Sequence, residues 1–158
     1  MRGVMPTGRV LIYDVDHFYM GGVLAQHLRS SGCDVALVTA LPEISQWTGL
    51  TLEQPRIVRT LASAGVAWHV HWTLAQLDER SATFACSYTD QVQGALEFDT
   101  FVMVGARLPD EGLYLELADR TNPEADAVTV TAIGDCVVPG TIAAAVLSGH
   151  ALARGLFA

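Results

Sequence analysis

The stretch from residue 9 to residue 40 changes its periodicity twice, and this constrains the fold more than any other part of the chain. Val10–Tyr13 is a short continuous apolar run, which is typical of a buried parallel strand. Over residues 18–31 apolar side chains recur every three or four residues, which predicts a helix that ends at Gly32. Residues 34–39 return to the pattern of a buried strand. The stretch therefore predicts a strand–helix–strand unit.

The first turn of this unit, YDVDHFYMGG at residues 13–22, is not a glycine-rich phosphate loop. In the dinucleotide-binding form, glycines let the backbone approach the pyrophosphate at the helix N-terminus. Here side chains fill that space, and a carboxylate would repel a phosphate by about 1 kcal/mol at about 4 Å in water. One interpretation is an altered ligand site, and the favoured one is a retained scaffold with a plugged loop. The candidate residues of this altered turn are Asp14, Asp16, His17 and Gly21.

The rest of the chain predicts an α/β fold with a Rossmann-like parallel sheet and an antiparallel β-meander. Thr51 and Gln54 fit a capping box for a helix that runs to about Ala64. Short strands are expected at residues 66–72, 73–77, 82–88, 92–98 and 99–104. Later elements are expected in the order short helix, polar loop, last strand and last helix, at residues 113–118, 119–126, 128–133 and 139–157.

A second candidate site lies in AIGDCVVPGTIAAAVLSGHALA, residues 132–153. A strand would deliver Asp135 to a loop, and Pro139 would begin the last helix. The amides at the helix start would face an anion, and Asp135 could accept a hydrogen bond from a ribose or ribityl hydroxyl. An N-capping aspartate before an alanine-rich packing helix remains the alternative. The residues of this site are Gly134, Asp135, Pro139, Gly140, Thr141 and Ile142.

Composition and spacing argue against several functional classes. The net charge of −8 argues against nucleic acid, whose affinity depends on basic side chains at phosphates. The cysteine and histidine spacings match no metal site, and no catalytic nucleophile motif is present. Proline, glycine, histidine and arginine interrupt the most apolar run, so no membrane span is expected. The odd cysteine count and the lack of a signal peptide favour the cytoplasm.

Four segments together are more specific than any single motif: residues 10–40, 47–69, 98–117 and 133–154. With them the chain resembles, over about residues 9–157, the C-terminal part of a flavin oxidoreductase family. That family includes trimethylamine, dimethylamine and histamine dehydrogenases and 2,4-dienoyl-CoA reductase. The trimethylamine dehydrogenase branch is nearest, because it too lacks the glycine fingerprint at the first turn.

The resemblance implies a glutathione-reductase-like arrangement. Residues 1–8 would be a loose lead-in, and residues 9–126 an NAD(P)-binding-like Rossmann domain. Residues 127–158 would be the strand and helix that return to an FAD/ADP-binding-type domain, with Asp135 facing the FAD or ADP. NAD(P) binding would be vestigial. FMN and a 4Fe–4S cluster would belong to an N-terminal barrel that the chain lacks, so no catalytic residue is expected in it.

The resemblance therefore implies a nucleotide-binding-type domain of an oxidoreductase, present as a fragment, a split subunit or a single domain. Its partner would be the missing flavin barrel, as a domain or a subunit. The last helix is apolar on more than one face, which also predicts self-association. Two alternatives stay open: a stand-alone FAD/ADP- or NAD(P)-binding module, and a structural or interaction protein on the same fold.

Overall fold

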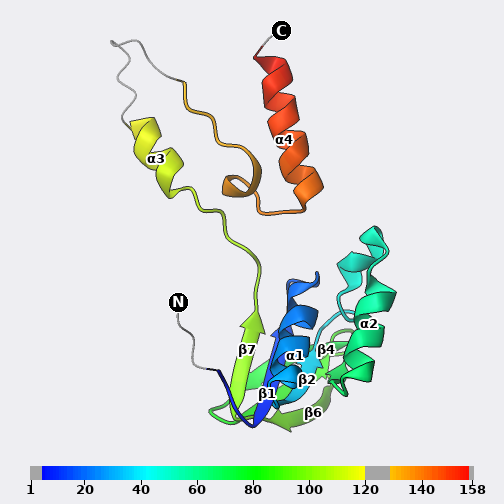
Figure 1. The fold of residues 1–158 in the computed structure, drawn as a ribbon. Coiled ribbons are helices and arrows are strands. Elements are labelled where there is room, and N and C mark those ends of the chain that lie inside the picture. The colour runs from blue at the N-terminus through cyan, green and yellow to red at the C-terminus, as the bar shows by residue number, and fades with distance from the viewer. Residues whose placement is uncertain (1–4, 120–128, 157–158) are drawn as a thin grey trace. The chain divides into compact units, whose positions relative to one another are not determined.

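The computed structural model describes residues 5–119 and 129–156 (Figure 1). The chain divides into two compact units between Ala106 and Arg107. The predicted boundary at residue 126 lies outside the described residues, as do residues 1–4 of the predicted lead-in.

The first unit is built on a parallel sheet with the strand order β3-β2-β1-β7. Its strands and the two helices α1 and α2 follow the local periodicity of the sequence. Val10 and Ile12 of β1 point toward these helices and pack with Leu28 of α1 and Leu61 of α2. The element bounds are β1 Arg9–Asp14, α1 Met20–Ser30, β2 Asp34–Val38, α2 Gln54–Ser63, β3 Ala67–His69 and β7 Thr100–Val104.

A three-stranded antiparallel sheet lies against the other face of the parallel sheet. It consists of β4 (Trp72–Leu77), β5 (Ser81–Cys86) and β6 (Val92–Glu97). Leu11 and Tyr13, which alternate with the helix-facing residues of β1, pack against Phe84 in a second buried cluster. The predicted fold class, a Rossmann-like parallel sheet with an antiparallel meander, is confirmed.

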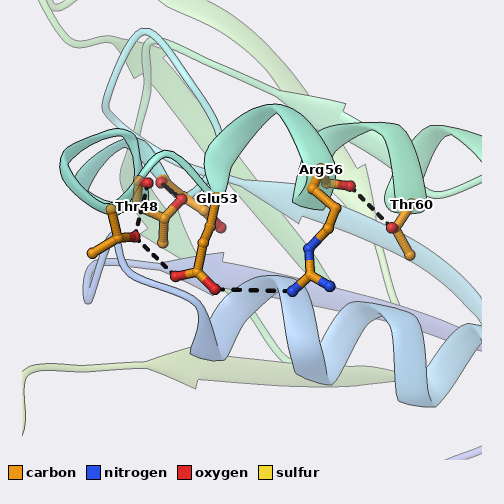
Figure 2. Close-up of polar contacts among 6 residues, drawn as sticks. Thr48, Glu53, Arg56 and Thr60 are labelled. Carbon is orange, nitrogen blue, oxygen red and sulfur yellow. Dashed lines mark hydrogen bonds and ion pairs between the residues drawn. The ribbon is translucent and has the colours of Figure 1, made fainter.

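The predicted capping box at the start of α2 is wrong. Residues Gln46–Thr51 form a 3-10 helix, η1, so Glu53 rather than Thr51 precedes α2. The Thr51 hydroxyl donates to Glu53 Oε2 at 2.8 Å, while the Gln54 amide donates to the carbonyl of Ile44 at 3.3 Å. Figure 2 shows Glu53 reaching along α2 toward Arg56, at 3.9 Å. Side-chain hydrogen bonds of Thr51 and Gln54 therefore connect the loop before α2 with the start of that helix.

The second unit contains α3 (Gly112–Asp119), the 3-10 helix η2 (Gly134–Cys136) and α4 (Ile142–Gly155). The last strand, predicted at residues 128–133, is wrong for residues 129–133, which form no strand. A strand needs a neighbour to bond its backbone, and the described residues of this unit contain no strand. The last helix begins at Ile142 instead of Pro139, because Thr141 caps it by accepting from the Ala144 N–H at 3.3 Å.

Two further sequence predictions depend on these elements. The polar loop predicted at residues 119–126 lies outside the described residues except for Asp119, which ends α3. Within the described parts of the chain, no helix is both long enough and apolar enough to cross a membrane.

Candidate functional site

Asp14 is the last residue of β1 and stands at the carboxyl edge of the parallel sheet, where such sheets bind ligands. Its side chain is only 1% exposed. Oδ1 accepts the backbone N–H groups of Asp16 and His17, both at 3.1 Å. The carboxyl therefore organises the turn that follows β1 from within.

The other oxygen of Asp14 lies against the first turn of α1. A Cβ added to Gly21 would stand 2.5 Å from Asp14 Oδ2, so only glycine leaves room for the carboxyl. Oδ2 is buried and has no hydrogen-bond partner among the described residues. Burial raises the pKa of Asp14 above its ordinary value of 3.8, while the amide hydrogen bonds of His17 and Asp16 act in the opposite direction.

His17 links the first turn to the loop that follows β2. Its backbone is left-handed, with φ 61°, and its Nδ1 lies 3.3 Å from the Thr39 hydroxyl. The backbone N–H of Trp47 donates to the His17 carbonyl at 3.0 Å. In dinucleotide-binding folds an acidic side chain near this second strand bonds the ribose. Here Thr39, which directly follows β2, contacts the His17 ring of the chain itself.

The structure thus brings together all four residues predicted for the altered turn: Asp14, Asp16, His17 and Gly21. Thr39 and Ser45 were not predicted from the sequence. Thr39 could have been suspected from its place directly after β2. The hydroxyl of Ser45, also buried, has no partner among the described residues and lies close to Gly22 of α1.

The second candidate site is a loop around η2 in the second unit. Gly134 has φ 65°, and its N–H donates to the Ser148 hydroxyl of α4 at 2.9 Å. Asp135 is exposed, and its Oδ1 accepts the Gly140 N–H at 3.3 Å. The Arg107 guanidinium, which the sequence argument missed, donates to the Gly140 carbonyl at 3.2 Å.

The remaining predicted residues of this second site take other roles. Thr141 caps α4 through its hydroxyl, and Ile142 is the first residue of that helix. Pro139 lies in the loop before the cap, where its missing N–H leaves no helix hydrogen bond unmade. The six residues therefore form one continuous loop and helix start, in which Asp135 is the carboxylate.

His69 and the arrangement of possible metal ligands bear on other kinds of site. His69 stacks on Trp72 with ring centroids 4.2 Å apart, and burial lowers the pKa of His69. In the described ranges, no group of three or more histidine, cysteine or acidic side chains is arranged to hold a metal ion.

Comparison with protein families gives a match over most of the first unit. The family described as "OYE-like second alpha/beta domain" matches residues 1–93. Among curated proteins, dimethylamine dehydrogenase of Hyphomicrobium sp. (strain x) is 28% identical over 165 residues. That alignment covers 92% of this chain and 22% of the dehydrogenase.

Two solved structures are similar in both sequence and fold. Histamine dehydrogenase from Rhizobium sp. 4-9 is 34% identical with a TM-score of 0.86, over 96% of this chain and 24% of that one. The 6-hydroxypseudooxynicotine amine oxidase from Pseudomonas geniculata N1 is 31% identical with a TM-score of 0.83, over 93% of this chain and 22% of that one. The chain spans less than a quarter of the length of each of these relatives.

Proposed function

The chain belongs to the OYE-like second alpha/beta domain family, and thus to the family of dimethylamine and histamine dehydrogenases, and we propose that it is a non-catalytic domain of such an amine oxidoreductase. The relatives are named for amine oxidation, and each is more than four times as long as the region matched here. In this proposal the amine chemistry belongs to a flavin-bearing partner domain or subunit. This chain contributes a folded α/β scaffold.

The observation that carries the proposal is the Asp14 carboxyl beneath Gly21. A pyrophosphate at the first turn would need this space, and Asp14 already holds the amides of Asp16 and His17. A phosphate about 4 Å from an ionised Asp14 would be repelled by about 1 kcal/mol in water, and by about 4 kcal/mol near a protein surface. NAD(P) binding at this turn is therefore vestigial in the proposal.

Contacts of the loop after β2 also support vestigial NAD(P) binding. The Trp47 N–H bonds the carbonyl of His17, and the His17 ring approaches the Thr39 hydroxyl. A dinucleotide would have to break both contacts to lie across the carboxyl edge. In this proposal the Asp14 carboxyl and the loop after β2 both occupy the carboxyl edge.

FAD or ADP is proposed only for the parent enzyme, at the Asp135 loop. The residues fit part of such a cofactor. Asp135 is exposed and can accept a hydrogen bond from a ribose or ribityl hydroxyl, and the N-terminus of α4 favours an anion such as a phosphate. When bound, FAD would supply electron transfer. The chain's own contribution would be to bind and orient it through Asp135 and the backbone near Gly140.

The partner in this proposal is the remainder of the flavoprotein, and the second unit presents the surface for it. Exposed apolar side chains recur along α4, namely Ile142, Val146 and Leu147, with 86%, 65% and 68% of their surface exposed. Exposed apolar surface of this kind is typical of interaction sites. In the absence of the partner the same surface favours self-association.

An amine-dependent dye-reduction assay tests the non-catalytic role. The purified chain is assayed with dimethylamine and with histamine, and its absorbance spectrum is recorded before and after adding FMN or FAD. We expect no amine-dependent reduction in any of these samples. Turnover of either amine by the chain alone would refute the proposal.

A further inference from the structure

We draw no further inference here: the strongest candidate, the apolar surface patch on α4 formed by Ile142, Val146 and Leu147, is the partner surface already proposed, and nothing in the described residues shows what covers it.

Discussion

Replacing Gly21 by alanine should destabilise the protein through its contact with Asp14. The added methyl would stand 2.5 Å from Oδ2 and 2.7 Å from Cγ of a carboxyl that two backbone amides hold in place. Overpacking of this kind costs about 1–3 kcal/mol. The higher helix propensity of alanine recovers about 1 kcal/mol. We therefore expect a net loss of up to about 2 kcal/mol in the free energy of unfolding.

The same substitution should have the opposite sign once the carboxyl is gone. In an Asp14→Ala background the contacts with Oδ2 and Cγ disappear and only a 3.1 Å approach to the Cβ of residue 14 remains. Gly21→Ala should then stabilise the protein through helix propensity, by less than about 1 kcal/mol. Urea unfolding of the four proteins of the double-mutant cycle measures this coupling, which should reach about 1–3 kcal/mol. Gly49→Ala is the control, because nothing lies within 4 Å of its added Cβ.

The result that would refute this reasoning is additivity. If Gly21→Ala costs the same with and without the Asp14 carboxyl, the two residues do not compete for the same space. A loss in Gly49→Ala as large as that in Gly21→Ala would likewise show that clash is not the cause.

Because burial raises the pKa of Asp14, the stability that its protonated form gives is complete below pH 3.8 and is lost as pH rises through the folded-state pKa. Asp14→Asn should flatten this part of the pH dependence of unfolding, and an unchanged slope would contradict the assignment. His17→Gly should be more stable to urea than His17→Ala by about 1 kcal/mol, since φ is 61° there; equal stabilities would exclude strain. Val146→Glu on α4 should reduce self-association in sedimentation experiments, and an unchanged sedimentation coefficient in an associating wild type would argue for another surface.

Local sequence patterns were sufficient to predict most helices and strands of the first unit. The change from a buried apolar run to a spacing of three and four residues predicted β1, α1 and β2 within one or two residues. The capping box at Thr51 failed because η1 occupies residues 46–51 and moves the helix start to Gln54. The strand expected before Gly134 failed for a different reason: pairing is not local, and the described second unit contains no neighbouring strand.

The first turn could be suspected from sequence because its residues are close together in the chain. Asp14, Asp16, His17 and Gly21 lie within a single strand–turn–helix connection, so the spacing alone brings them together. The contact between His17 and Thr39 could not be predicted in this way, because 22 residues separate them. Nor does the sequence reveal that Gly21 makes room for a carboxyl, since a glycine at this position equally suits a pyrophosphate.

The most direct test of the central claim, that Asp14 and the loop after β2 close the carboxyl edge to a dinucleotide, is a calorimetric titration of the wild-type chain with NADPH and with NADH. The account predicts only heats of dilution for both, because the turn amides and the space beside Gly21 are already taken by Asp14. Saturable binding of either dinucleotide with a Kd of about 1 µM, or about −8 kcal/mol, would contradict it.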